Sequence, residues 1–131
     1  MVVVDASVWI AWFKQEDAFR EEARRIILSL SLSQEKITIP AIAFSEVAGA
    51  IKRITKSNDD AWEALFSMKG MKLEVVADSE KLEPTASKIA INHNIRGADA
   101  CYLAVAEMTR SKLITFDQQQ QKAFDELSKA W

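Results

Sequence analysis

Short apolar runs alternate along the chain with longer segments in which apolar side chains recur every three to four residues. The short runs are rich in β-branched residues and predict buried strands at Val2–Val4, Ile37–Ile39, Leu73–Val76 and Leu113–Thr115. The longer segments predict helices at Ser7–Phe13, Ala18–Leu32, Ala43–Ile54, Asp59–Met68, a segment ending near His93, Ala98–Met108 and Gln118–Lys129. This alternation predicts an α/β fold of three layers, in which helices flank a parallel sheet of four to five short strands.

Local signals refine these boundaries. Pro40 is expected to end the second strand, Asn58 to cap the helix that begins at Asp59, and Pro84 to lie in the first turn of the next helix. The segment Ala98–Met108 is apolar on nearly every side, which predicts a buried helix.

Composition narrows the possible classes of protein. The 131 residues are 49% hydrophobic and 27% charged, which is typical of one globular domain spanning residues 1–131. A net charge of −2 argues against a protein that coats nucleic acid through bulk charge. One cysteine, Cys101, and one histidine, His93, exclude an intrachain disulfide, a Cys-rich zinc site and any site that needs two histidines. No apolar run is long enough to cross a membrane and Val2–Val4 lacks the flanks of a signal peptide, so we expect a cytoplasmic protein.

Four acidic residues are predicted to meet at one edge of the sheet. Asp5 directly follows the first strand, and Asp117 comes two residues after the last. Glu46 and Asp99 fall in the first turns of helices that are expected to begin at the same edge. In parallel α/β sheets, ligands bind beyond the carboxyl ends of the strands, so we expect a functional site at this edge.

Each acid also has a purely structural explanation. Asp5, or Ser7 close by, can cap the first helix, Asp117 can cap the last, and Glu46 and Asp99 suit the first turn of a helix. Carboxylates crowded into a partly dry pocket, however, repel one another and raise each other's pKa values, and a bound cation relieves this repulsion. Because only oxygen ligands are available, we expect Mg²⁺ or Mn²⁺, which can polarise a phosphodiester and lower the pKa of a bound water.

The motifs that contain these acids resemble those of the PIN-domain nucleases, whose small members are VapC-type toxins of toxin–antitoxin pairs. The matching segments cover essentially the whole chain: Val2–Val8, Pro40 with Glu46 six residues on, Arg96–Ala100 and Ile114–Asp117. The resemblance implies a PIN-like fold in which Asp5, Glu46, Asp99 and Asp117 bind metal, and Ser7 and Thr115 are polar supports of the catalytic site. It further implies Mg²⁺- or Mn²⁺-dependent cleavage of RNA, a homodimer, and a small VapB-type antitoxin. Phe116 departs from the smaller residue that the family often has there.

The remaining polar and aromatic residues are less specific. Lys14, Lys52, Arg53 and Arg96 are candidates for contacts with an RNA phosphate, although a solvated surface explains each as well. Trp9, Trp12 and Phe13 are interpreted as core or dimer packing, Trp62 and Phe66 as core or partner surface, and Gln118–Gln121 as a polar helix start.

Other functions fit less well. A haloacid-type hydrolase needs a second Asp where this chain has Ser7, and Asp78 and Lys112 do not suit a receiver domain. Two alternatives stay open: a housekeeping PIN nuclease in RNA maturation, and a non-catalytic PIN-like binding module. A neighbouring gene for a small DNA-binding antitoxin would separate a toxin from a housekeeping nuclease.

Overall fold

The computed structural model describes all residues from Met1 to Trp131. Its centre is a four-stranded, fully parallel sheet in the order β3-β2-β1-β4. The strands are β1 (Val2–Val4), β2 (Ile37–Pro40), β3 (Leu73–Val76) and β4 (Lys112–Ile114). Every residue of β1 and β2 is buried, as expected for central strands covered on both faces. The predicted α/β fold with a parallel sheet is confirmed.

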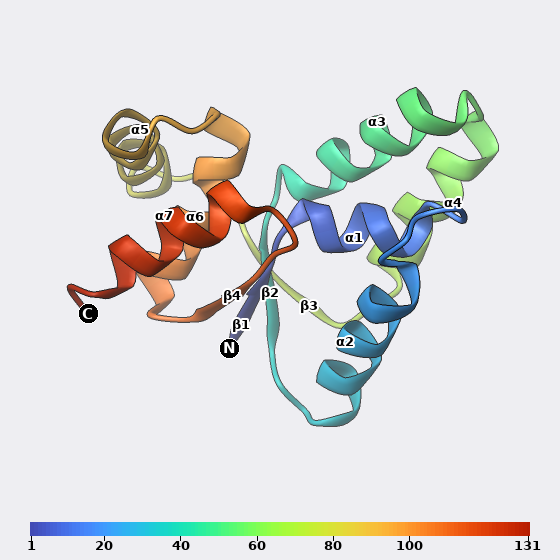
Figure 1. Cartoon of the computed structure of the whole chain (residues 1–131), viewed down its shortest axis with the longest axis horizontal. Helices are drawn as coiled ribbons and strands as arrows, with labels where there is room; N and C mark the ends of the chain where they lie inside the picture. The colour runs from blue at the N-terminus through green and yellow to red at the C-terminus, as the bar shows by residue number, and fades with distance from the viewer.

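Seven helices form the outer layers (Figure 1). In the view of Figure 1, α5, α6 and α7 lie to one side of the sheet and the other helices lie to the opposite side. Their bounds are α1 (Ala6–Phe13), α2 (Arg20–Leu32), α3 (Ala43–Thr55), α4 (Asn58–Lys69), α5 (Leu82–His93), α6 (Gly97–Thr109) and α7 (Gln118–Ser128). None of these helices combines the length and the apolarity that a membrane span requires.

The hydrophobic core surrounds the sheet, and all seven helices contribute buried residues to it. Helix α6 packs across β1, β2 and β4. Six of its residues between Ala100 and Ala106 are buried, which confirms the burial predicted for this segment. On the other side, α1 packs against α2 and α3, and its Trp9 is fully buried. Both helices begin at the carboxyl-terminal edge of the sheet, so the core fixes the position of their first turns.

The start of α4 differs from the sequence-based expectation. Ser57, not Asn58, is the N-cap: its backbone is extended, and its Oγ accepts a hydrogen bond of 3.1 Å from the Asp60 backbone N–H. Asn58 already has a helical position and offers no cap to the helix. Both residue types are good caps, and the extended backbone at Ser57 decides between them.

The two candidate caps give a direct stability prediction. Ser57→Ala is expected to lower the free energy of unfolding by about 1 kcal/mol, because the Asp60 N–H loses its partner. Asn58→Ala is the matched control and is expected to change it by less than about 0.5 kcal/mol, since its side chain caps nothing. Urea denaturation of both variants checks this, and equal losses would contradict the assignment of Ser57.

Candidate functional site

The site lies where the strand order reverses. From the central strand β1 the chain proceeds outward to β2 and β3, and it then returns to place β4 on the other side of β1. Such a reversal opens a crevice at the carboxyl ends of the two strands. Asp5 directly follows β1 and Asp117 comes three residues after the end of β4, so both acids reach this crevice. β1 and β4 are parallel neighbours in the sheet, which brings the ends of these two strands side by side.

Hydrogen bonds hold the carboxylate of Asp5 in place. Its Oδ2 accepts from Ser7 Oγ at 2.8 Å and from Thr115 Oγ1 at 2.7 Å. Each hydroxyl accepts a backbone N–H in turn, Ser7 Oγ from Phe116 and Thr115 Oγ1 from Asp117, both at 3.0 Å. These bonds tie the start of α1 to the connection between β4 and α7, so Asp5 has little freedom to turn.

The other oxygen of Asp5 has no partner. Asp5 is only 3% exposed, and its Oδ1 is buried without any hydrogen bond. A buried carboxylate oxygen in this state costs free energy unless a donor or a cation reaches it. The arrangement therefore fixes one carboxylate oxygen that has no partner within the protein.

Glu46 and Tyr102 form a second fixed group. Glu46 lies in the first turn of α3, and its Oε1 accepts a hydrogen bond of 2.7 Å from the hydroxyl of Tyr102 on α6. Burial raises the pKa of Glu46, and the charges of Asp99 and Asp5 raise it further, while the hydrogen bond from Tyr102 and the charge of Arg96 oppose this shift.

Asp99 completes the group from the first turn of α6. Burial raises the pKa of Asp99, and the charges of Asp5 and Asp117 add to the rise. Arg96 offsets part of it, because its Nε lies 3.5 Å from Asp99 Oδ2. Asp5, Glu46, Asp99 and Asp117 thus lie at one edge of the sheet, close enough for their charges to act on one another.

The acids are not, however, a complete cage for a metal. No three Asp, Glu, His or Cys side chains are arranged to hold one ion by themselves. Asp5 and Asp117 also serve as N-caps, of α1 and α7, so the structural explanation applies to them as well. The free oxygen of Asp5 and the repulsion among the acids still suit Mg²⁺ or Mn²⁺, since a Mg²⁺ ion usually keeps several waters and binds one or two carboxylates.

The profile of the PIN domain matches residues 2–127, which is nearly the whole chain. The chain belongs to the PIN-domain family. Among curated protein sequences, none matches it.

Solved structures agree with this PIN-domain fold. VapC20 of Mycobacterium tuberculosis, described as a toxin that cleaves the sarcin-ricin loop, superposes with a TM-score of 0.79 at 21% identity, over 94% of this chain and 95% of its own. VapBC2 of Rickettsia felis, bound to a DNA fragment from its promoter, gives 0.73 at 13% identity, over 94% and 93%. FitAcB of Neisseria gonorrhoeae gives 0.70 at 18% identity, over 95% and 94%. At these identities the likeness establishes the fold.

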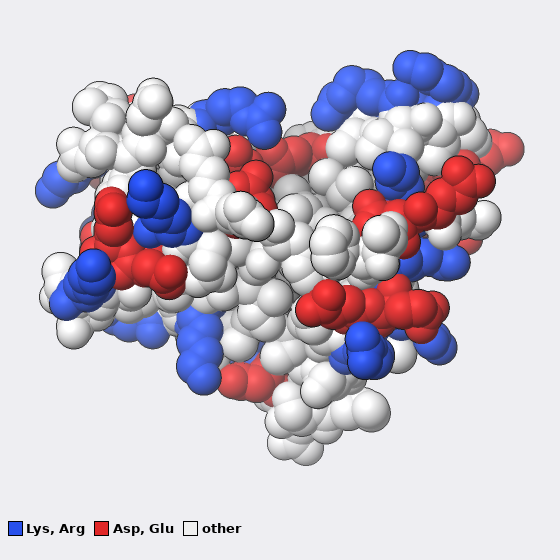
Figure 2. Space-filling model, in the orientation of Figure 1, with Lys and Arg blue, Asp and Glu red and all other residues white.

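The basic candidates lie at different distances from the acids of this PIN domain. Arg96 contacts Asp99 directly and is 87% exposed at its side chain. Lys52 and Arg53 are exposed in the last turn of α3, beyond Glu46. In Figure 2, acidic side chains occupy the hollow between α3 and the helices α6 and α7, and basic side chains lie along the outer side of α3.

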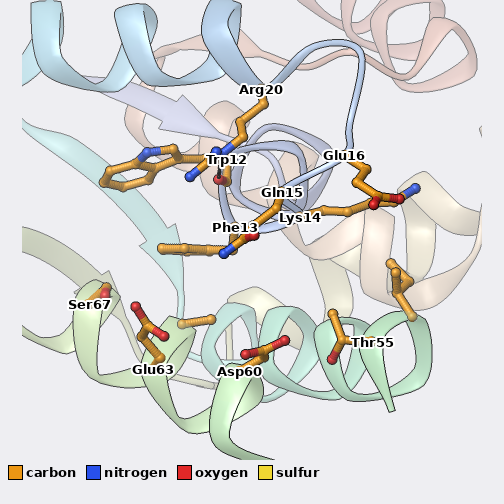
Figure 3. A pocket seen from close by; sticks show the side chains of 12 residues that line it. Trp12, Phe13, Lys14, Gln15, Glu16, Arg20, Thr55, Asp60, Glu63 and Ser67 are labelled. Carbon is orange, nitrogen blue, oxygen red and sulfur yellow. Dashed lines mark hydrogen bonds between the residues drawn. The ribbon is translucent and has the colours of Figure 1, made fainter. Parts of the chain in front are cut away.

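Lys14 lies elsewhere. It follows the last residue of α1, whose length of about 12 Å separates it from the acids at the other end. It lines a pocket of about 470 Å³ between this end of α1 and the helices α3 and α4, together with Phe13, Glu16 and Asp60 (Figure 3). The structure therefore does not bring Lys14 to the four acids.

Sequence reasoning missed two residues of the site. Tyr102 was not singled out, although it follows Asp99 by three residues and so lies on the same face of α6. Gln120 was interpreted as part of a polar helix start, yet it is only 2% exposed. Its side-chain amide donates to the Asp99 carbonyl at 2.8 Å, and its backbone N–H donates to Asp117 Oδ1 at 3.0 Å. It therefore joins the first turns of α6 and α7.

The raised pKa values predict how the stability of the metal-free protein depends on pH. A carboxyl group with a raised pKa in the folded state stabilises the fold fully below its ordinary pKa, and this contribution is lost as the pH rises through the raised value. The ordinary values are 4.5 for Glu46 and 3.8 for Asp99. The variant Glu46→Gln/Asp99→Asn is therefore expected to match the native protein well below pH 3.8 and to become progressively more stable than it at higher pH. Thermal melts in a chelator across this range check the trend, and a difference that shrinks as the pH rises would contradict it.

Proposed function

We propose that this PIN domain is a Mg²⁺- or Mn²⁺-dependent endoribonuclease and the toxin of a toxin–antitoxin pair. One observation carries the proposal: Asp5 is held rigidly with an unpartnered buried oxygen, among acids that repel one another. A divalent cation would supply the missing partner and offset the repulsion.

The residues have distinct roles in this proposal. Asp5, Glu46, Asp99 and Asp117 would hold the ion, directly or through its waters. When bound, the ion polarises the phosphodiester, lowers the pKa of a bound water and neutralises charge that develops on the phosphate. Ser7 and Thr115 keep Asp5 oriented through the hydrogen bonds to its Oδ2.

Arg96 would serve the substrate. Its guanidinium is exposed beside Asp99, where it offers a positive charge to an RNA phosphate that approaches an otherwise acidic crevice. Lys52 and Arg53 are further along α3 and would contact phosphates away from the scissile bond. Lys14 is not part of this proposal.

The toxin assignment rests on the relatives. The similar structures include VapC20, VapBC2 and FitAcB, and VapC20 is described as a toxin. By analogy we propose a small VapB-type antitoxin as the protein partner and a second copy of the chain as the dimer partner.

Induced expression of the chain is expected to arrest growth, and co-expression of an antitoxin from a neighbouring gene is expected to restore it. A chain that leaves growth unchanged would favour a housekeeping nuclease.

Removal of metal tests the nuclease directly. Cleavage of single-stranded RNA is expected to fall by at least about 100-fold in excess EDTA, because the ion contributes several kcal/mol to the transition state. Cleavage should return when Mg²⁺ or Mn²⁺ is added in excess over the chelator. Rates measured on one labelled RNA check this, and cleavage that persists in EDTA would contradict metal dependence.

A further inference from the structure

Tyr102 joins the buried helix to the acidic crevice. Its side chain is fully buried on α6, one helical turn beyond Asp99, and its hydroxyl donates to Glu46 Oε1 at 2.7 Å. Glu46 is 56 positions away in the sequence and lies on α3. The contact therefore couples two helices that each contribute an acid to the site.

We propose that Tyr102 is a positioning residue, which holds Glu46 in the conformation that binds the divalent ion. The proposal rests on the proposed function, since it concerns the metal that this function requires. Because the hydroxyl occupies Oε1, it leaves Oε2 of Glu46 as the oxygen free for the ion or its waters.

Glu46 needs such a partner for a physical reason. Its side chain is only partly buried, so rotation toward water is open to it, and the negative charges of Asp99 and Asp5 favour that rotation. A glutamate also has several rotatable bonds, whereas the ring of Tyr102 is fixed by the core packed around it. The hydrogen bond thus restrains a flexible carboxylate by tying it to the rigid helix α6.

The chemistry of the donor suits a metal site. A phenol donates a hydrogen bond without adding a positive charge, so the crevice keeps its full attraction for a cation. A Lys or Arg at the same place would compete with the ion for Glu46.

The test compares metal binding in the full chain without RNA. Tyr102→Phe keeps the ring and removes only the hydroxyl. We expect it to weaken Mn²⁺ binding, measured by calorimetry or by the EPR signal of free Mn²⁺, by about tenfold. Thr38→Val is the matched control: Thr38 is fully buried on β2, its Oγ1 has no hydrogen-bond partner, and its loss should leave Mn²⁺ affinity unchanged.

A double-mutant cycle separates positioning from a general structural effect. If Tyr102 acts through Glu46, Tyr102→Phe should weaken Mn²⁺ binding in the native background and have no further effect in the Glu46→Ala background. Equal losses in both backgrounds would overturn the proposal, as would a Tyr102→Phe protein that binds Mn²⁺ as tightly as the native chain. A native chain that binds no Mn²⁺ would instead overturn the proposed function.

Discussion

Asp5→Asn is expected to reduce metal-dependent cleavage of RNA by at least about 100-fold. Asparagine has nearly the same shape, and its amide oxygen can still accept from Ser7 and Thr115, so the local fold should persist. What it lacks is the negative charge, and with its oxygen at the position of Oδ2 it places an N–H₂ donor where the buried Oδ1 now stands. An N–H₂ group cannot act as a ligand to a cation.

The same variant should lose stabilisation by metal. A ligand that binds only the folded state adds about 2.7 kcal/mol to the free energy of unfolding at 100 times its Kd. Mn²⁺ at that excess is therefore expected to raise the melting temperature of the native chain by roughly 10 °C, and to leave that of Asp5→Asn nearly unchanged.

Asp59→Asn is the control for both measurements. Asp59 is an exposed acid in the first turn of α4, so its replacement changes the net charge equally without touching the crevice. It should cleave RNA and respond to Mn²⁺ like the native chain. An Asp5→Asn protein that cleaves as fast as Asp59→Asn would refute the role of Asp5.

Trp9→Ala is expected to lower the free energy of unfolding by about 3–5 kcal/mol, a larger loss than removal of the Ser57 cap causes. Trp9 is fully buried, and its indole N–H donates to the Val4 carbonyl at 3.1 Å. Truncation leaves a large cavity between α1 and the sheet and removes the partner of a buried carbonyl. Because Val4 is the last residue of β1 and directly precedes Asp5, the loss should also disturb the acidic crevice.

Urea denaturation checks this, with Trp62→Ala as the control. Trp62 is 56% exposed on α4, where it stacks on Phe66, so its truncation should cost less than about 1 kcal/mol. The partner-surface interpretation of Trp62 and Phe66 agrees with their exposure, whereas the core interpretation does not. Similar losses for Trp9→Ala and Trp62→Ala would contradict the distinction drawn between them.

Much of the architecture could be predicted from the sequence because its signals are local. A β-branched run such as Val2–Val4, or apolar residues at helical spacing, reports burial on one or both sides of an element without reference to the rest of the chain. The alternation of strands and helices predicts a parallel sheet, and this limits where an acid that follows a strand can point. For that reason the sequence placed Asp5, Glu46, Asp99 and Asp117 at one edge of the sheet, and the structure puts them there.

Contacts between distant segments could not be predicted in the same way. The bond from Tyr102 to Glu46, the burial of Gln120 beneath Asp99 and the isolation of Asp5 Oδ1 each depend on how helices from separate parts of the chain pack on the sheet. No periodic pattern marks them, since a hydrogen bond forms only when packing brings two groups within about 3 Å in the right direction. The sequence by itself thus determined which elements form and where the acids emerge. Only the tertiary structure decided which of those acids are held by hydrogen bonds and which one keeps an oxygen without a partner. It also decided that Lys14 faces a different pocket.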